Sequence, residues 1–223
     1  MLYWFLKKFL LGPWLRVLFR PWIEGEENIP ADGPALLVSN HLSFSDSIFL
    51  PLVLKRRATF LAKSDYFTGT GPKGMLSRLF FGGTGQVPID RSGGKASEAA
   101  LTTGLRILGK GELLALYPEG TRSHDGKLYR GRTGAARMAL HAEVPVIPVA
   151  MIGTFEPQLR RIGVRIGKQI DFSRYYGMAE DRFVLRSATD EMMYDLMQLS
   201  GQTYQDMYAT AAKQQSREAA AGA

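Results

Sequence analysis

The sequence contains no cysteine, and this absence excludes several kinds of chemistry at once. Disulfide bridges, thiolate zinc sites and a cysteine nucleophile all need a thiol, so none of them is available to this chain. A reducing cytoplasm is compatible with this composition.

Long apolar stretches are missing as well. No uncharged apolar run approaches the roughly 18 residues that a membrane-spanning helix needs. Residues 1–22 are nevertheless very apolar between their charges and contain all three tryptophans. We expect two short amphipathic helices, divided at Gly12 and Pro13, that lie on or in the bilayer interface. A pair of core helices with basic edges is the alternative. A signal peptide is disfavoured, because Gly12 and Pro13 break the stretch and no small-x-small cleavage site follows.

Acidic residues are fewer than basic ones: the chain has 21 aspartates and glutamates and 28 lysines and arginines, which gives a formal net charge of +7. Such a surface suits nucleic acid, anionic lipid or phosphorylated substrates, and the charge alone does not choose among them. Two segments are strongly basic: residues 1–22 carry four cations and no acid, and residues 122–137 carry five cations against Asp125. Tyr129 is the only aromatic residue in the second segment, which disfavours nucleic acid as the partner.

The 223 residues are 45% hydrophobic and 22% charged, which suits one large globular domain. Short apolar runs alternate with helical patterns, and this alternation predicts an α/β fold with a central, largely parallel sheet flanked by helices. The expected strands are 35–39, 58–62, 85–89, 113–117 and 146–152, with 162–167 as a further strand. The expected helices are 45–54, 75–81, 96–109, 133–142 and 178–213.

A histidine and an aspartate follow the first of these strands, where open α/β sheets place their chemistry. His41 can act as a base near pH 7, and Asp46 can fix its tautomer and stabilise the imidazolium. Two residues five apart do not share a face of a regular helix. We therefore expect His41 in the turn before the helix and Asp46 folded back from the first helical turn, with Ser43 or Ser45 as the cap. The alternative is a capping turn with an incidental histidine.

A second group, Tyr-Pro-Glu-Gly-Thr-Arg-Ser at 117–123, follows another apolar strand. Gly120 lets the backbone turn closely, and Thr121 and Arg122 offer a hydroxyl and a forked cation that suit a phosphate. We expect Glu119 to hold Arg122 in place. The alternative is a surface turn with an Arg–Glu pair.

A third strand, 85–89, delivers Arg91 at its end beside an acid. A surface ion pair is the alternative interpretation.

Four features follow one another along the chain. They are His-x4-Asp at 41–46, Arg91 after the glycine-led strand, Pro-Glu-Gly-Thr-Arg at 118–122 and the proline-bearing strand at 144–149. This combination resembles the glycerolipid acyltransferase family, which includes the 1-acylglycerol-3-phosphate O-acyltransferases, over residues 24–155. Outside this span the family adds only that an apolar N-terminal membrane segment is common. We expect membrane-associating helices at 1–22, an acyltransferase domain at 23–213 and a flexible tail at 214–223.

The resemblance also implies roles for the motif residues. His41 would be the general base that takes the proton of a glycerol hydroxyl, and Asp46 would orient it. The acceptor oxygen would then attack the thioester of an acyl donor. The phosphate of the acceptor would be bound by residues from three strand ends, namely Lys63, Arg91, Glu119, Gly120, Thr121 and Arg122.

The implied partners are acyl-CoA or acyl carrier protein as donor, lysophosphatidic acid or a related lysophospholipid as acceptor, and an anionic membrane surface. No metal or cofactor is implied, and we expect a peripheral or monotopic protein on the cytoplasmic face of the cell membrane. One alternative is a lipid or thioester hydrolase with Ser39, Ser43 or Ser45 as nucleophile, although the chain has no G-x-S-x-G elbow. The other is a non-enzymatic domain that binds anionic lipid.

Overall fold

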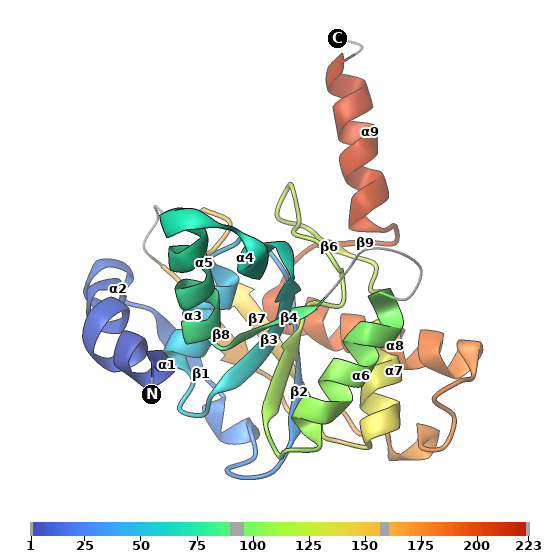
Figure 1. Ribbon diagram of the computed structural model, residues 1–223. Helices are drawn as coiled ribbons and strands as arrows, with labels where there is room; N and C mark the ends of the chain where they lie inside the picture. Colours follow the sequence, from blue (N-terminus) through green and yellow to red (C-terminus); the bar gives the residue numbers. More distant parts are fainter. Residues whose placement is uncertain (1, 90–95, 157–160, 222–223) are drawn as a thin grey trace.

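The computed structural model describes residues 2–89, 96–156 and 161–221, without the side chain of Lys63 (Figure 1). At its centre lies a seven-stranded sheet with the order β1-β8-β7-β2-β5-β3-β4. The strands of this sheet are β1 (Trp22–Glu24), β2 (Ala35–Ser39), β3 (Ala58–Lys63), β4 (Gln86–Ile89), β5 (Leu113–Leu116), β7 (Val146–Ile152) and β8 (Gly163–Ile166).

Five neighbouring strands, from β7 across to β4, run parallel to one another, whereas β8 pairs antiparallel with β7 and β1 follows β8. The prediction of an α/β fold with a largely parallel sheet is therefore confirmed. All five expected strands are present, and the further one at 162–167 is β8. A separate pair, β6 (Leu128–Tyr129) and β9 (Tyr204–Gln205), was not predicted because each strand has only two residues.

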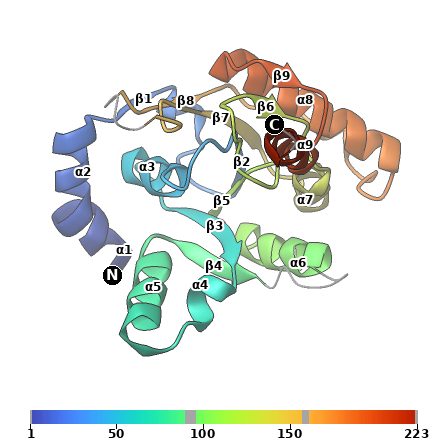
Figure 2. The same ribbon diagram turned by 90° about the horizontal axis from the view of Figure 1, so that it is seen from above.

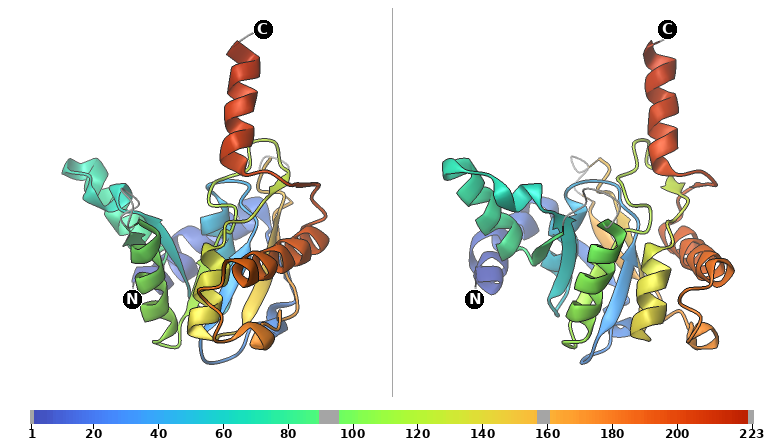
Figure 3. Two further views of the ribbon diagram at one scale, coloured as in Figure 1. Left: turned by 90° about the vertical axis from the view of Figure 1, so that its right-hand side faces the viewer. Right: turned by 45° about the vertical axis from the view of Figure 1, so that its right-hand side comes forward.

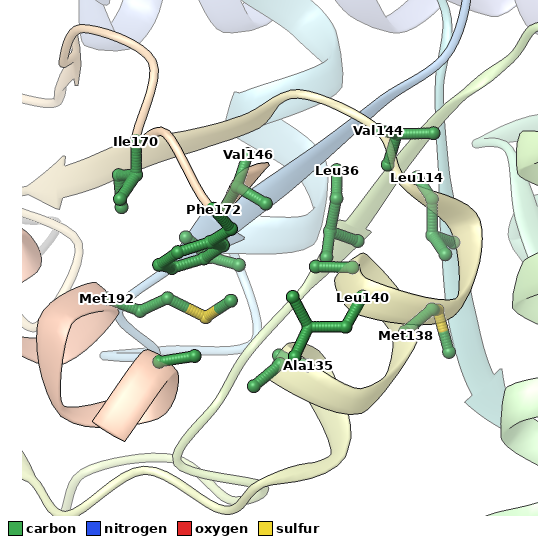
Figure 4. Close-up of a cluster of buried hydrophobic side chains, with 14 of the residues drawn as sticks. Leu36, Leu114, Ala135, Met138, Leu140, Val144, Val146, Ile170, Phe172 and Met192 are labelled. Atoms are coloured by element: carbon green, nitrogen blue, oxygen red, sulfur yellow. The ribbon is translucent and has the colours of Figure 1, made fainter. Parts of the chain in front are cut away.

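Helices cover both faces of the sheet because successive side chains of each buried strand point to opposite faces. On one face, Leu36 and Val38 of β2 pack against α6 (Ala96–Leu108), α7 (Gly134–Ala142) and α8 (Arg182–Ser200). Figure 4 shows side chains of α7 and α8 converging on β2 in this cluster. On the other face, Leu37 packs with α3 (Asp46–Val53).

The N-terminal segment is helical from Leu2 to Phe19, in three consecutive parts. These are α1 (Leu2–Phe5), a π-helical stretch (Leu6–Leu10) and α2 (Leu11–Phe19). A break was predicted at Gly12 and Pro13. The change from π-helix to α-helix occurs slightly earlier, between Leu10 and Leu11, so that Pro13 is the third residue of α2. Proline has no amide hydrogen to donate to the preceding turn, which accounts for irregular helix at this point. None of the helices within the described ranges is long and apolar enough to cross a membrane.

Residues 178–213 do not form the single helix that was predicted. Helix α8 ends at Ser200, and Gly201 follows with a φ of 70° that favours glycine, its N–H bonded to a carbonyl of the last turn. After β9 the chain enters α9 (Ala209–Ala221), so residues 214–221, expected to be a flexible tail, are helical. Figures 1 and 3 show α9 standing away from the body of the molecule, and Figure 2 views it end-on beside β6.

Two further helices, α4 (Asp65–Thr68) and α5 (Gly71–Gly83), lie at the sheet edge formed by β4 (Figure 2). Short 3-10 helices occur at Glu26–Asn28 and Ser173–Tyr175. Helices α4 and α5 follow β3 and precede β4, and α5 contacts both β4 and α1. Their position matters for the site, because they lie beside the ends of β3 and β5 from which the predicted functional residues extend.

Candidate active site

The two principal motifs meet because β2 and β5 are parallel neighbours in the sheet, with Val38 opposite Leu116. The loops after their carboxyl ends therefore leave the same edge of the sheet. The backbone N–H of Ser123 donates to the carbonyl oxygen of His41 at 2.7 Å. Sequence-distant loops thus form one hydrogen-bonded unit.

His41 lies in the turn after β2, and Asp46 is the first residue of α3, as the spacing predicted. Nδ1 of His41 lies 2.8 Å from Oδ2 of Asp46. The same carboxylate oxygen accepts from the backbone N–H groups of Leu42 at 2.7 Å and Ser43 at 2.8 Å. Asp46 is fully buried, so these donors replace water around its charge and hold it in place.

The predicted serine cap is wrong, since neither Ser43 nor Ser45 caps α3 through its hydroxyl. Ser45 occupies the cap position without a side-chain capping bond, and the hydroxyl of Ser43 accepts from Ser45 instead. The N–H of Ile48, which a capping hydroxyl of Ser45 could have accepted, donates instead to the backbone carbonyl of Ser45 at 2.9 Å.

The ring of His41 is fixed in a plane and faces a cavity. It stacks on Tyr117 with centroids 3.8 Å apart and an interplanar angle of 9°. The hydroxyl of Tyr117 lies 3.0 Å from that of Ser47, and burial raises the pKa of the Tyr117 phenol well above its ordinary value, so it stays neutral. Because Nδ1 faces a carboxylate, it carries the ring proton, and Nε2 is left as a proton acceptor. The side chain is 16% exposed.

Glu119 does not hold Arg122, which corrects the predicted role. Its carboxylate accepts from the backbone N–H groups of His41 and Tyr129, each at 2.9 Å. Within the described ranges no hydrogen bond or ion pair joins it to Arg122. Burial raises the pKa of Glu119 to about 7, against the opposing effect of these two backbone donors. Glu119 is thus a positioning residue that fixes the His41 turn to the loop after β5.

Gly120, Thr121 and Arg122 line the same cavity as His41. Gly120 has a φ of 74°, and a Cβ there would lie 3.1 Å from the side chain of Arg132, so this tight turn requires glycine. Arg122 is exposed, and no ion pair among the described residues involves it. The structure therefore brings Gly120, Thr121 and Arg122 to the cavity that His41 lines.

Lys63 and Arg91 are the two other predicted phosphate ligands. Lys63 is the last residue of β3, where its backbone pairs with Ile89 at the end of β4. Arg91 lies outside the described residues.

Sequence reasoning missed the function of Asn40 beside the histidine. Its buried amide accepts from the N–H of Met151 at 2.7 Å and donates to the carbonyl of the same residue at 3.0 Å. It also donates to Gln202 at 2.6 Å, and Gln202 donates to the carbonyl of Gly126 at 2.6 Å. Asn40 therefore ties the His41 turn to the neighbouring strand β7. An asparagine directly after a fully buried strand was the available signal.

The cavity beside His41 has a volume of about 280 Å³ and a lining of mixed chemistry. Ser47, Gln86, Thr121 and Arg122 supply polar groups to this lining. Apolar side chains come from β3, α4 and α5 and include Phe60, Leu61, Ala62, Tyr66 and Phe81. The arrangement suits a ligand that carries both an apolar chain and an anionic group and reacts beside the histidine.

A neighbouring cavity of about 510 Å³ lies over α6 and α7 and shares Leu61, Leu116, Tyr117 and Gly120 with the first. No group of three or more histidine, aspartate or glutamate side chains that could hold a metal ion occurs in the part of the chain that the structure describes.

Comparison with known proteins adds independent findings. The family model described as Acyltransferase matches residues 20–152. The chain is 34% identical over 151 residues to the 1-acyl-sn-glycerol-3-phosphate acyltransferase LPAT1, chloroplastic, of Arabidopsis thaliana, which covers 66% of this chain and 41% of that protein. It is 34% identical over 116 residues to the human 1-acyl-sn-glycerol-3-phosphate acyltransferase beta, which covers 52% of this chain and 40% of the relative. The chain thus spans about two fifths of the length of these relatives.

A solved structure has the same fold. The crystal structure of the 1-acyl-sn-glycerophosphate (LPA) acyltransferase PlsC from Thermotoga maritima matches with a TM-score of 0.57 and 22% identity, over 85% of this chain and 79% of that one.

Proposed function

The chain belongs to the Acyltransferase family, and on this premise we propose that it transfers a fatty acyl group from a thioester to a hydroxyl of lysophosphatidic acid or a related lysophospholipid. One observation carries the proposal: the buried Asp46 orients His41, which lines a cavity that both apolar side chains and the cation Arg122 also line. The names of the relatives, which refer to 1-acyl-sn-glycerol-3-phosphate, support this acceptor.

The reaction follows from the free lone pair on Nε2 of His41. This nitrogen takes the proton of the acceptor hydroxyl while the hydroxyl oxygen attacks the thioester carbonyl carbon. The tetrahedral intermediate then expels the thiolate, which receives the proton back from the imidazolium. Asp46 stabilises the imidazolium between these two transfers, and general acid–base catalysis of this kind contributes about 10²–10⁴-fold in rate.

A serine nucleophile is not supported by the geometry. Ser39 is buried and donates to the carbonyl of Asn40, and the hydroxyls of Ser43 and Ser45 bond to each other at 3.2 Å. Among the described hydrogen bonds none joins a serine hydroxyl to His41. Direct transfer from donor to acceptor therefore fits the site better than a hydrolase with an acyl-enzyme.

The chemistry of the cavity lining suggests which substrate group each part of it binds. The apolar wall around Phe60 and Phe81 suits an acyl chain, and Thr121 with Arg122 suits the acceptor phosphate, which a planar guanidinium binds through paired hydrogen bonds. Both candidate donors, acyl-CoA and acyl carrier protein, are acidic and complement the net charge of +7.

We further propose that the N-terminal segment attaches the enzyme peripherally or monotopically to the cytoplasmic face of the cell membrane. One side of the segment packs on α3, where Phe19 contacts Phe49 with centroids 5.1 Å apart. The other side exposes Phe9 (72%), Trp14 (77%) and Val17 (76%). An apolar helix face of this kind favours the boundary between headgroups and acyl chains.

Two of the four N-terminal cations also bond to backbone carbonyls of the domain. Lys7 donates to the carbonyl of Leu54, and Arg16 donates to that of Leu52 at 3.0 Å. These two cations therefore satisfy carbonyl groups at the end of α3. Lys8 and Arg20, which are exposed like Arg16 but make neither of these two carbonyl contacts, are the simplest candidates to meet an anionic surface.

The proposal is tested with purified protein, a panel of labelled acyl-CoA and acyl carrier protein donors, and a panel of lysophospholipids. Formation of a diacyl phospholipid that depends on the acceptor is the expected result, and its acyl position identifies the hydroxyl used. Release of free fatty acid at the same rate without acceptor would instead assign the chain to the hydrolases.

A further inference from the structure

The first half of α9 lies on the loop that carries Thr121 and Arg122. Ala209 and Ala212 are buried against Tyr129, next to that loop. Nζ of Lys213 donates to Oγ1 of Thr121 at 3.2 Å. The remainder of the helix projects away from the domain (Figures 1 and 3). Lys213, which lies 92 positions along the chain from Thr121, therefore contacts a residue that lines the cavity beside His41.

Further contacts hold α9 in this position. Nη2 of Arg132 donates to the hydroxyl of Thr210 at 3.3 Å, and Nε2 of His124 lies 3.0 Å from the hydroxyl of Ser216. The guanidinium of Arg132 also lies 5.1 Å from the ring centroid of Tyr208, just before the helix. The placement of Lys213 thus rests on several independent contacts.

Lys213 lies near other cations. Arg122 and Arg217 act on it together, and after burial they are the main reasons that its pKa is lowered, while Glu119 opposes them. No ion pair in the described part of the chain involves any of these three cations. By contrast, Arg130 in the same region pairs with Asp206. Cations that repel one another beside a substrate cavity are stabilised by a bound anion.

We propose that Lys213 is a further substrate-binding residue, which binds the phosphate monoester of the acceptor jointly with Arg122 and Thr121. The inference rests on the proposed function. Because the hydroxyl of Thr121 accepts from Lys213, its own hydrogen is free to be donated to a phosphate oxygen. Lys213 lies outside residues 20–152, so the family match does not assign it this role.

A purely structural role for Lys213 makes different predictions. If the lysine only held α9 against Thr121, its loss would affect all substrates alike. If it binds phosphate, its loss raises KM for a phosphorylated acceptor and leaves kcat and the donor KM nearly unchanged. A raised donor KM would place the phosphates of the donor, not of the acceptor, at this residue.

The test compares wild type with Lys213→Met, which keeps the aliphatic stem, and with Lys213→Arg, which keeps the charge. Gln214→Ala is the matched control, because Gln214 is exposed on the same helix and bonds only to Glu218. KM is measured for lysophosphatidic acid, for monoacylglycerol with the same chain, and for the donor. Equilibrium binding of short-chain lysophosphatidic acid and of monoacylglycerol without donor gives the same comparison without turnover.

For Lys213→Met we expect a KM and a dissociation constant for lysophosphatidic acid raised by roughly 10-fold or more, as for loss of a charge-assisted hydrogen bond. Values for monoacylglycerol should change little, and Lys213→Arg should recover most of the loss. If KM and the dissociation constant change equally for both acceptors, or do not change, the inference about Lys213 is overturned. Transfer by the wild type would leave the proposed function intact in that case. Absence of wild-type transfer would overturn the proposed function, and the binding comparison would still decide whether Lys213 binds phosphate.

Discussion

Two buried carboxylates stabilise the active site at the residue scale, and they act differently. Asp46 contacts the ring of His41 and two backbone N–H groups through one oxygen. Glu119 contacts only backbone, through both oxygens. Asp46 therefore fixes the tautomer of His41 and stabilises its protonated form, whereas Glu119 holds the backbone of the turn that carries His41.

Asp46→Asn separates charge from shape. The amide oxygen can accept the same hydrogen bonds as Oδ2, while the amide nitrogen would take the place of Oδ1, which has no partner. We expect kcat to fall by about 10²–10⁴-fold, because the imidazolium loses its counter-charge, with little change in KM. Steady-state kinetics measure this, with Ser43→Ala as the matched neighbouring variant that should retain activity. Near wild-type kcat in folded Asp46→Asn would contradict the role of the aspartate.

Glu119 should make stability depend on pH. Its ordinary pKa is 4.5, and burial raises the folded-state pKa to about 7. Between these values the folded protein holds a proton that the unfolded chain has released, so stability falls as pH rises through this window, on the order of 3 kcal/mol in all. Below pH 4.5 both states are protonated and the effect vanishes.

Comparison with Glu119→Gln isolates this effect, since glutamine does not titrate. The free energy of unfolding of wild type minus that of the variant should decrease from pH 4.5 to 7, as measured by urea denaturation. The variant should also be less stable at low pH, because its amide can accept only one of the two backbone N–H groups. A difference that is constant or increases with pH would contradict a raised pKa.

At this scale the sequence predicted one pair and missed another. His41 and Asp46 are close in sequence, so the turn between strand and helix sufficed to place them together. The partners of Glu119 are backbone groups 78 and 10 positions away, and residue type carries no signal for such contacts. The chemically obvious partner, Arg122, was therefore chosen wrongly.

At the scale of elements, the N-terminal helical segment has separate packing and exposed faces. Tyr3 donates to the carbonyl of Pro51, and Leu15 and Phe19 pack on the core around α3. Deleting residues 1–22 would also remove Trp22 of β1, so that a loss of membrane binding could not be separated from a loss of folding. Substitutions confined to the exposed face avoid this problem.

The combined change of Phe9, Trp14 and Val17 to serine should therefore reduce flotation with anionic liposomes severalfold while leaving the melting temperature nearly unchanged. Phe183→Ser is the control, because Phe183 on α8 is even more exposed than these three residues. Replacing Lys8 and Arg20 by glutamine should weaken binding to anionic vesicles more than to neutral ones, at roughly 1 kcal/mol per cation. Unchanged flotation of the triple variant would move the attachment site to another surface.

Helix boundaries were predictable only where local signals were strong. The α8–α9 region was expected to be one helix, although Gly201 is the kind of residue that ends helices. The tertiary contacts that place α9, including that of Lys213 with Thr121, join distant parts of the chain. No periodicity in residues 209–221 indicates them.

At the scale of the whole molecule, the order of the strands assembles the site. Alternating apolar runs predicted a parallel sheet, because buried parallel strands are apolar on both faces. The adjacency of β2 and β5, which are separated in sequence by β3 and β4, follows from packing of the complete sheet and was not predicted from local pattern. This adjacency brings the loop of His41 and the loop of Arg122 to one cavity.

The central claim is that His41 is the base in transfer of an acyl group to a phosphorylated glycerol hydroxyl. The most direct test measures diacyl phosphate ester and free thiol from labelled acyl-CoA, or the carrier-protein thioester if that is the donor used, and lysophosphatidic acid, for wild type and for His41→Ala. We expect equal amounts of both products from wild type, and a fall in kcat of about 10²–10⁴-fold in a His41→Ala protein that remains folded by circular dichroism. Turnover near the wild-type rate in that folded variant would contradict the account.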